Sequence, residues 1–325
     1  MSQIDALNRT LVMEICRVTE AAAVAASRLT GRGDEKAADQ AAVDAMRRAL
    51  LDLDIQGRVV IGEGERDEAP MLYIGELVGN GTGPKVDIAL DPLEGTTITA
   101  KAMPNSLAVI AFAEHGNFLH SPDVYMDKIA VGGGYPAGVV DLDKTTKENV
   151  ESLAKAKGVP VGEITACVLD RPRHADIIND LREVGCRVAL IGDGDVAGVI
   201  ACTDEDTGVD IYIGQGGAPE GVLAAAALRC IGGQMQGRLV FRNDDERGRA
   251  AKAGITDLDR KYELEELAAG DVIFAATGVT NGSLLDGVTR NRDGSVDTES
   301  IIMRSATGTV RRIRGRHVSE DKFKA

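Results

Sequence analysis

The stretch Val86-Asp87-Ile88-Ala89-Leu90-Asp91-Pro92-Leu93-Glu94-Gly95-Thr96 runs from an apolar strand pattern into two acids and a glycine hinge. In α/β proteins, side chains from different segments converge at the ends of strands. Asp91 followed by Pro92 is also compatible with a simple turn, because both residue types initiate turns. The combination of a buried strand with Asp91, Glu94 and Thr96 instead predicts a functional site at this strand end.

Further acids lie upstream of this stretch. Asp39 lies near the start of an expected helix, and residues 63–68 form an acidic loop that begins with Glu63 after an expected strand. Taken singly, Asp39 would stabilise a helix dipole and the loop would be solvated surface. If several of these acids share a pocket, repulsion of about 4 kcal/mol per close pair at intermediate dielectric opposes their ionisation. Cations would remove that conflict, and oxygen ligands without paired His or Cys favour Mg²⁺ or Mn²⁺ over Zn²⁺.

The first half of the chain predicts helices packed on a sheet. Apolar residues recur at helical spacing over residues 7–29 and again over residues 37–53. Strand patterns follow at residues 58–61, 86–90 and 107–111. Asp39 lies at the head of the apolar stripe of the second helix.

The pattern changes after Gly158-Val159-Pro160. Strands at 164–169, 187–191 and 209–213 alternate with helices at 174–184, 196–202 and 221–231, and strand patterns return at 272–276 and 300–316. Such alternation indicates a parallel sheet with crossover helices. Because a single core rarely extends beyond about 250–300 residues, we expect two subdomains, residues 1–158 of α+β type and residues 159–325 of α/β type.

The 325-residue chain is acidic, with 51 Asp and Glu against 37 Lys and Arg and a formal net charge of -14. This charge repels polyanions, so we expect no nucleic-acid partner and no membrane-surface partner. A small phosphorylated ligand would need metal ions or a local arginine cluster to overcome the same repulsion.

Cysteine usage and hydropathy bear on the compartment. The five cysteines are widely spaced and include no C-x-x-C pair, which predicts reduced thiols. The sequence shows no N-terminal signal pattern, and no apolar run approaches the roughly 18 residues of a membrane span. We therefore expect a soluble cytoplasmic protein.

Asp91-Pro92-Leu93-Glu94-Gly95-Thr96 resembles the D-P-(I/L)-(D/E)-G-T signature of lithium-sensitive, metal-dependent phosphatases, the superfamily of inositol monophosphatase and fructose bisphosphatase. Longer segments resemble one branch of it, the class II fructose-1,6-bisphosphatases of bacteria. They are Val60-Ile61-Gly62-Glu63-Gly64-Glu65, Ala69-Pro70-Met71-Leu72-Tyr73, Arg171-Pro172-Arg173-His174, Asp193-Gly194-Asp195-Val196-Ala197 and Gly216-Gly217-Ala218-Pro219-Glu220-Gly221. The resemblance covers nearly the whole chain.

The resemblance implies a layered α/β/α/β/α sugar-phosphatase fold, with metal binding in the first subdomain and substrate binding in the second. It implies hydrolysis of the 1-phosphate of fructose 1,6-bisphosphate to fructose 6-phosphate with two or more Mn²⁺ or Mg²⁺ ions per subunit. Asp39 and Glu63 would hold one ion, and Asp91, Glu94 and Glu220 a second. A homo-oligomer, dimer or tetramer, is also expected.

The same resemblance assigns the contacts to the sugar bisphosphate. They are Glu94, Gly95, Thr96, Tyr125, Arg171, Pro172, Arg173, Asp193, Gly194, Asp195 and Gly217. One guanidinium group can donate two parallel hydrogen bonds to phosphate oxygens, so Arg171 and Arg173 are expected at the 6-phosphate. Asp193 and Asp195 are suited to accept hydrogen bonds from sugar hydroxyls. Thr96, hydrogen-bonded to an acid such as Asp67, is expected to orient and deprotonate the attacking water.

Two departures separate this chain from the inositol-phosphatase branch. Glu94 stands where those proteins have Asp, and Pro219-Glu220 replaces their W-D motif. Both departures fit the class II branch. The alternatives that remain are a sedoheptulose-bisphosphate phosphatase, alone or in addition, an inositol phosphatase, and a non-catalytic metabolite-binding protein.

Three features of the sequence carry weaker signals. Residues 192–198 imitate a dinucleotide-binding glycine loop, but Asp193 and Asp195 would face a pyrophosphate there, which argues against NAD. His174 is expected either at a phosphate or as a polar residue at a helix start. The arginines near the C-terminus predict a solvated strand face, or less simply an anionic effector site; they are Arg311, Arg312, Arg314 and Arg316.

Overall fold

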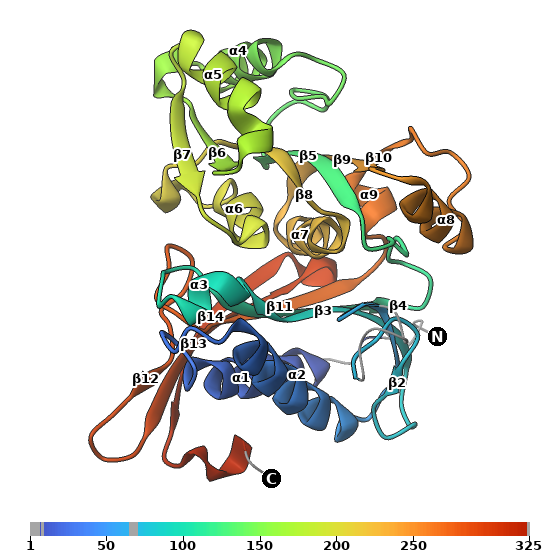
Figure 1. The fold of residues 1–325 in the computed structure, drawn as a ribbon, viewed down its shortest axis with the longest axis vertical. Helices are drawn as coiled ribbons and strands as arrows, with labels where there is room; N and C mark the ends of the chain where they lie inside the picture. Colours follow the sequence, from blue (N-terminus) through green and yellow to red (C-terminus); the bar gives the residue numbers. More distant parts are fainter. Residues whose placement is uncertain (1–6, 8–9, 65–70, 324–325) are drawn as a thin grey trace. The chain divides into compact units, whose positions relative to one another are not determined.

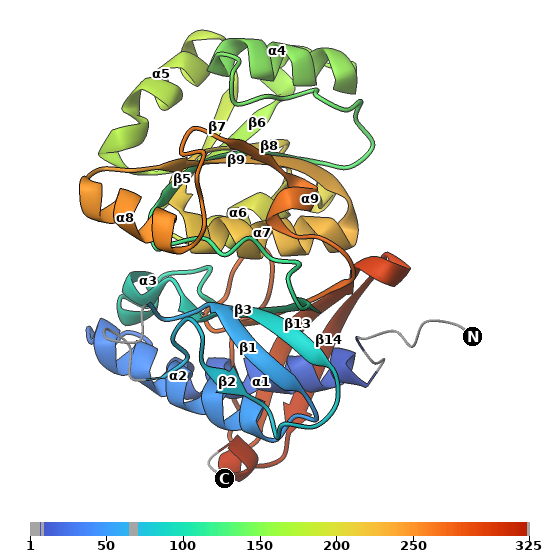
Figure 2. The same ribbon diagram turned by 90° about the vertical axis from the view of Figure 1, so that its right-hand side faces the viewer.

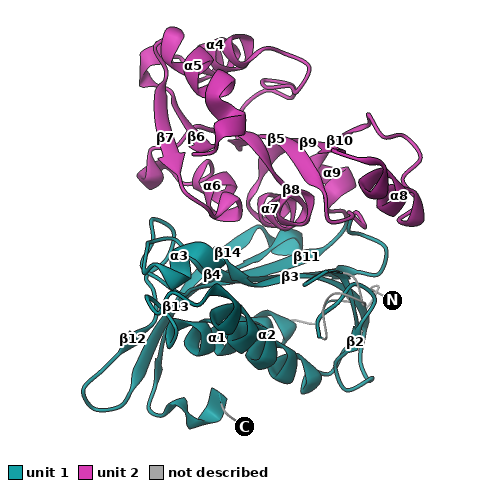
Figure 3. Cartoon of the chain, in the orientation of Figure 1, with its two compact units in different colours: residues 1–118, 270–325 teal, residues 119–269 magenta. Residues whose placement is uncertain are grey.

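The computed structural model describes Leu7 and residues 10–64 and 71–323. Its internal contacts divide the chain into two compact units, which Figure 3 colours separately. Unit 1 comprises Met1–Phe118 and Gly270–Ala325, and unit 2 comprises Leu119–Ala269. In the described part of the chain, no helix combines the length and the apolar character that crossing a membrane requires.

The unit boundaries differ from the division expected at residue 158. The difference arises from non-local strand pairing, because the strand Val272–Gly278 lies antiparallel to the strand Leu107–Glu114. The C-terminal strands therefore return to the sheet that the N-terminal half begins. Unit 2 is inserted between these two neighbouring strands.

Unit 1 contains a sheet with the strand order β12-β13-β11-β4-β3-β1-β2 (Figure 1). Strand β14 also belongs to this sheet and pairs with β13 outside that order. The strands are β1 (Gln56–Ile61), β2 (Leu77–Val78), β3 (Lys85–Glu94), β4 (Leu107–Glu114), β11 (Val272–Gly278), β12 (Thr289–Arg290), β13 (Val296–Arg304) and β14 (Thr309–His317). The pair β1 and β3 is parallel, and the other pairs are antiparallel. The tail that was predicted as one strand is two, because the turn Ser305–Thr307 reverses the chain.

The two predicted N-terminal helices are confirmed and cover one face of the unit 1 sheet (Figure 2). They are α1 (Leu11–Ser27) and α2 (Glu35–Leu51). Two short elements pack on them: α3 (Thr96–Ala100) contacts α2, and η5 (Glu320–Phe323) contacts α1. Their apolar faces meet the sheet in one core, where Ile15, Met46, Ile88 and Phe112 are fully buried. Burial of these side chains, each worth roughly 1.5–3 kcal/mol, holds α2 and its Asp39 against β3.

Unit 2 contains a sheet with the order β10-β9-β5-β8-β6-β7. The strands are β5 (Tyr125–Gly132), β6 (Thr165–Leu169), β7 (Arg187–Ile191), β8 (Ile211–Gly217), β9 (Gly233–Val240) and β10 (Lys261–Glu263). The predicted parallel arrangement holds where β6 pairs with β7 and β8. The sequence did not predict β5, β9 and β10, which complete the sheet by antiparallel pairing with β8 and with one another.

Helices cover both faces of the unit 2 sheet (Figure 2). The helices are α4 (Thr146–Lys157), α5 (Ala175–Glu183), α6 (Asp195–Ala201), α7 (Ala218–Ile231), α8 (Asp244–Lys252) and α9 (Leu264–Leu267), with short turns η1 (Val161–Glu163), η2 (Pro172–His174) and η3 (Glu205–Thr207). Leu153 of α4 and Leu181 of α5 pack with Ile129 and Val168 in a core on one face. On the opposite face α6 and α7 pack on the central strands. Both units are therefore layered helix and sheet, as an α/β fold requires.

Candidate functional site

The acidic end of β3 is shaped by a bulge. Asp91 pairs with Val109 while Glu94 pairs with Leu107, so three residues of β3 span two of β4. Pro92 lies inside this irregularity, where its missing N–H costs no ladder bond. The backbone N–H of Leu93 donates to Asp91 Oδ1 at 3.0 Å. The bulge therefore re-aims Asp91 and the buried Glu94 at the strand end.

Gly95 turns this strand end into the helix that begins at Thr96. Its φ of 87° is left-handed, and a Cβ there would come within 2.6 Å of Ile98 Cγ1. Ser106 Oγ donates to the Glu94 carbonyl at 3.0 Å, and Thr99 Oγ1 donates to the Gly95 carbonyl at 3.1 Å. These bonds hold Thr96 in the first turn of α3 in a fixed orientation.

Asp39 lies in the second turn of α2. The capping position is taken by Asp34, whose Oδ1 accepts from the Ala37 N–H at 3.0 Å. The helix-dipole explanation of Asp39 is thereby weakened, because the macrodipole acts mainly in the first turn. Burial raises the pKa of Asp39. A cation bound beside the carboxyl would lower that pKa again.

Glu63 follows β1, and its backbone N–H donates to the Leu72 carbonyl at 3.0 Å. Asp67, the acid expected to assist Thr96, lies outside the described residues. Within the described ranges, no three His, Cys, Asp or Glu side chains form a group that could hold a metal ion.

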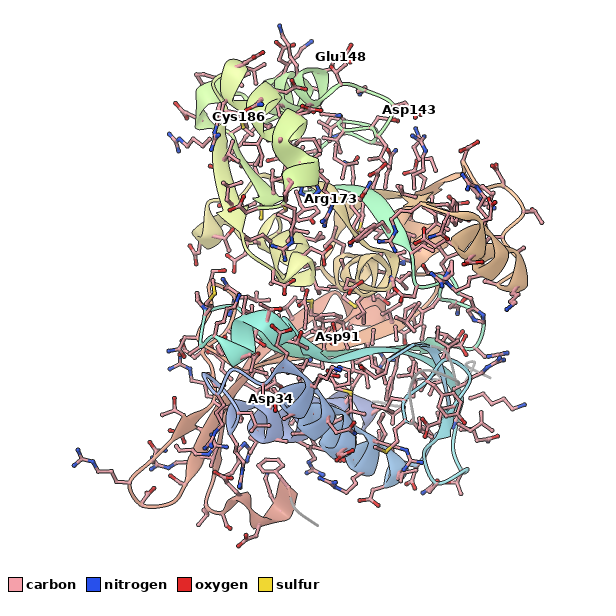
Figure 4. The ribbon with its side chains drawn as sticks, viewed as in Figure 1. Asp34, Asp91, Asp143, Glu148, Arg173 and Cys186 are labelled. Atoms are coloured by element: carbon pink, nitrogen blue, oxygen red, sulfur yellow. The ribbon has the colours of Figure 1, made fainter. Side chains whose placement is uncertain are left out.

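In unit 2 two arginines lie against one tyrosine ring. Arg173, labelled in Figure 4, has its Cζ 4.9 Å from the centre of the Tyr125 ring. The Cζ of Arg242 lies 4.6 Å from the same centre. The Gln215 carbonyl accepts hydrogen bonds from Arg173 Nε at 3.1 Å and Nη2 at 2.7 Å. Two guanidinium groups therefore bring positive charge to the same aromatic ring.

Arg242 was missed by the sequence analysis. It follows β9, a strand that the sequence did not predict, and its Nε donates to Glu246 Oε1 at 2.7 Å. The signal was present in the segment Arg242-Asn243-x-x-Glu246, because Asn243 caps α8 and accepts from the Glu246 N–H at 2.9 Å. That capping pattern places Arg242 at a junction between strand and helix.

Arg171 is less firmly held than Arg173. Its Nη2 lies 4.0 Å from Asp193 Oδ1, and its Nη1 donates to the neighbouring Asp170 carbonyl at 3.2 Å. Pro172 is the first residue of η2, the turn that sets the two arginines apart. The Gly194 N–H donates to Asp193 Oδ1 at 3.2 Å.

The end of β8 carries two carboxylates over adjacent glycines. Asp195 of α6 forms an ion pair with the buried Lys128 of β5. Glu220, the third residue of α7, has a buried Oε2 without a hydrogen-bond partner. A Cβ on Gly216 would overlap Asp195, and one on Gly217 would overlap Glu220. Both glycines are therefore required by the close approach of the acids.

Burial, reinforced by the nearby Asp195, raises the pKa of Glu220 to about 7. A cation is the natural partner for such an oxygen, because it would supply the missing contact and restore the carboxylate form. The donor at Glu220 therefore fits a metal ion. Lys128 was also missed by the sequence analysis; a lysine inside the apolar strand β5 was the available signal.

Two open questions from the sequence are answered by contacts. His174 is 1% exposed, and both of its ring nitrogens bond backbone groups, so it does not present to a phosphate. Two of the β14 arginines pair with acids of their own unit: Arg314 Nε lies 3.0 Å from Glu299 Oε1, and Arg316 Nη2 lies 3.0 Å from Asp293 Oδ2. These contacts favour the solvated strand face over an effector site.

Comparison with known proteins places the chain in a family. Residues 9–317 match the family described as bacterial fructose-1,6-bisphosphatase, glpX-encoded. Proteins from Prochlorococcus marinus (strain NATL1A) and Parasynechococcus marenigrum (strain WH8102) are each 44% identical over 330 residues, 97% of this chain and 98% of the relative. Both are named D-fructose 1,6-bisphosphatase class 2/sedoheptulose 1,7-bisphosphatase. This chain, whose motifs at β3 and β8 carried the resemblance, therefore belongs to the family of bacterial glpX-encoded fructose-1,6-bisphosphatases.

Proposed function

We propose that this chain hydrolyses the 1-phosphate of fructose 1,6-bisphosphate in a metal-dependent reaction, releasing fructose 6-phosphate and phosphate. The family match over residues 9–317 is the observation that carries the proposal. The arginine pair at Tyr125 and the acids of β3, α2 and α7 support it, since a bisphosphate needs both kinds of site. Nothing else in the described residues offers two guanidinium groups beside one ring.

Sedoheptulose 1,7-bisphosphate is the second proposed substrate. The two relatives above and a third from Synechococcus sp. (strain CC9605), 44% identical over 331 residues, carry both activities in their names. The two sugars share the phosphate that is cleaved and differ by one carbon before the second phosphate. Long arginine side chains on a short turn, such as Arg171 and Arg173, suit that difference in reach.

We assign the metal ions to the five carboxylates named above, with Mn²⁺ or Mg²⁺ as the cation. Asp39 and Glu63 are proposed to hold one ion, and Asp91, Glu94 and Glu220 a second. Bound cations of this kind activate a water and neutralise the leaving oxygen. The raised pKa of Asp39 and of Glu220 supports the assignment, because burial disfavours the charged form of each carboxyl and a bound cation would offset that cost.

Thr96 is proposed to orient the attacking water. Gly95 and the hydrogen bonds of Ser106 and Thr99 hold the start of α3, and with it the backbone that carries the Thr96 hydroxyl. A hydroxyl accepts one proton and donates another, so Thr96 Oγ1 would accept from water while donating to the Asp67 carboxylate. The proton of the water would thus come to rest on Asp67.

The rest of the site is proposed to hold the sugar and its second phosphate. Arg171, Pro172, Arg173 and Tyr125 are proposed to contact the 6-phosphate. Asp193 accepts hydrogen bonds from sugar hydroxyls, as does Asp195, whose direction is fixed by Lys128. Gly95, Gly194 and Gly217 are proposed to let the substrate approach the backbone closely, because they carry no Cβ.

Phosphate release from a panel of substrates tests the proposal. Fructose 1,6-bisphosphate and sedoheptulose 1,7-bisphosphate should be hydrolysed with Mn²⁺ or Mg²⁺, whereas fructose 6-phosphate and inositol 1-phosphate should be poor substrates. Tight binding of the bisphosphate without any release in the presence of either metal would instead support a metabolite-binding protein. Preference for inositol 1-phosphate would support the other phosphatase branch.

A further inference from the structure

His174 joins two strands through its imidazole ring. Nδ1 donates to the Leu169 carbonyl of β6 at 2.7 Å, and Nε2 accepts from the Gln215 N–H of β8 at 2.8 Å. This pair of bonds fixes the neutral tautomer that carries its proton on Nδ1. Burial lowers the pKa of His174 and keeps the ring in that neutral form.

The ring stands where the direct pairing of β6 and β8 has ended. Their parallel register stops at Cys167 opposite Tyr212. The imidazole takes the place of the missing backbone ladder at Leu169, two residues beyond Cys167, and at Gln215, three residues beyond Tyr212. Gly214 leaves room for it, since a Cβ there would lie 3.2 Å from His174 Nε2. The ring therefore sets the separation of the two strands at their carboxyl ends.

Gln215 connects this bridge to the phosphate site. Its N–H is bonded to His174, its carbonyl accepts both bonds from Arg173, and its side-chain Nε2 donates to Asp127 Oδ1 at 2.9 Å. One peptide segment thus receives the imidazole on one side and presents the arginine acceptor on the other. Moving the Gln215 N–H would move the carbonyl that aims the guanidinium.

We propose that His174 is a positioning residue for phosphate recognition, acting through Gln215 on the direction of Arg173. The inference rests on the proposed role of Arg173 at the second phosphate of the substrate. His174 touches no substrate, so its loss weakens substrate binding and leaves the chemical step intact. A ring that served only the core would affect stability without any selective effect on KM.

Two substitutions separate the bonds of the ring. The amide of H174N reaches the place of Nδ1 and keeps the bond to Leu169, whereas the longer H174Q places its oxygen near Nε2 and keeps an acceptor for Gln215. H174N should raise KM for fructose 1,6-bisphosphate about tenfold, equivalent to about 1.4 kcal/mol, with kcat within about twofold. H174Q should restore KM to within about threefold of wild type, because it keeps the bond that matters. Thermal unfolding of both variants monitors the fold.

A double-mutant cycle with R173A tests the connection. R173A should raise KM by itself, and adding H174N to R173A should raise it no further, since the two changes remove one interaction. A raised KM in R173A with wild-type KM in H174N would overturn the role of His174 and keep the phosphate assignment. A wild-type KM in R173A would instead overturn the phosphate assignment, whatever H174N does. Additive effects would also overturn the connection.

A measurement on the unsubstituted ring covers the case in which both variants unfold. Nitrogen-15 NMR of histidine should show one buried ring protonated on Nδ1, whose signals shift when fructose 6-phosphate is added to wild type. The same addition to R173A should leave them unshifted. A ring protonated on Nε2, or signals that ignore fructose 6-phosphate in wild type, would overturn the proposal.

Discussion

Arg173 lies with its guanidinium carbon 4.9 Å from the centre of the Tyr125 ring, while the Gln215 carbonyl accepts two of its N–H groups. The arginine is therefore fixed before any ligand arrives, with one edge bonded to the backbone and one face on the ring. A guanidinium held in this way loses little conformational entropy on binding phosphate. Arg171 has no comparable anchor, so we expect Arg173 to contribute more than Arg171 to phosphate binding.

Replacing Arg173 with alanine should raise KM for fructose 1,6-bisphosphate roughly ten- to a hundredfold, because one charge-assisted hydrogen bond contributes roughly 1.5–3 kcal/mol. The preference for the bisphosphate over monophosphates should narrow as well. Arg171→Ala should have the smaller effect. Steady-state kinetics provide the measurement, with Arg182→Ala, an exposed arginine of α5, as the matched control. Wild-type KM in both Arg171→Ala and Arg173→Ala would place the 6-phosphate elsewhere.

Thr96→Ala should leave substrate binding intact while kcat falls by about two or more orders of magnitude, the range of general-base catalysis. Thr96→Ser keeps the hydroxyl and should retain most of the activity. Thr97→Ala, one residue further along α3, controls for the loss of a threonine from the same turn. Single-turnover kinetics distinguish chemistry from product release. An undiminished kcat in Thr96→Ala would mean that another residue orients the attacking water.

The sequence predicted the elements with strong local periodicity and missed those made by distant pairing. Helices α1 and α2 and strands β3 and β4 were predicted because their apolar spacing is unambiguous. Strands β5 and β9 were not, since the buried Lys128 and the glutamines of β9 read as polar surface. Their burial depends on partners such as Asp195, which lies 67 residues from Lys128 in sequence.

The candidate site shows the same division between local and distant information. One short segment, residues 91–96, contains Asp91, Glu94, Gly95 and Thr96. The order of residues in this segment was enough to indicate a strand end followed by a helix start. No local sequence pattern singles out Arg242, because its distinguishing feature is that its guanidinium lies over the ring of Tyr125, a residue of β5. Short motifs can be read from sequence, whereas neighbours across a sheet require its register.

Glu20 of α1 provides a pH-dependent prediction far from the phosphate site. Its Oε1 lies 3.7 Å from His317 Nε2 and accepts from the Thr298 hydroxyl at 3.3 Å. Burial raises the pKa of Glu20 and lowers the pKa of His317, so it favours the neutral form of each group. A raised carboxyl pKa contributes stability below the ordinary value of the group, and that contribution is lost as pH rises through the folded-state value.

Glu20→Gln should therefore increase the free energy of unfolding at pH 8, where wild type must ionise a buried carboxyl. The difference from wild type should shrink as the pH falls below the raised pKa. Denaturant unfolding across this pH range measures it, with Glu14→Gln on the exposed side of the same helix as control. A variant less stable than wild type at pH 8 would indicate an ionised pair with His317.

The cysteines should be unreactive in the native protein. All five are buried, and burial raises the pKa of Cys16 and Cys186 to about 11 and that of Cys167 to about 12. Since the thiolate is the nucleophile, a thiol reagent at pH 8 should label none of them within minutes, and all five after unfolding in guanidinium. Rapid labelling of the native protein would reveal an opening that the buried positions do not predict.

Phosphorus-31 NMR of fructose 1,6-bisphosphate turnover tests the central claim most directly. Protein stripped with a chelator should leave the substrate unchanged. Added Mn²⁺ or Mg²⁺ should then convert the two substrate resonances into those of fructose 6-phosphate and inorganic phosphate, with Mg²⁺ preferable for sharp lines. Turnover in excess chelator, or release of the 6-phosphate to give fructose 1-phosphate, would contradict a metal-dependent hydrolysis at C1.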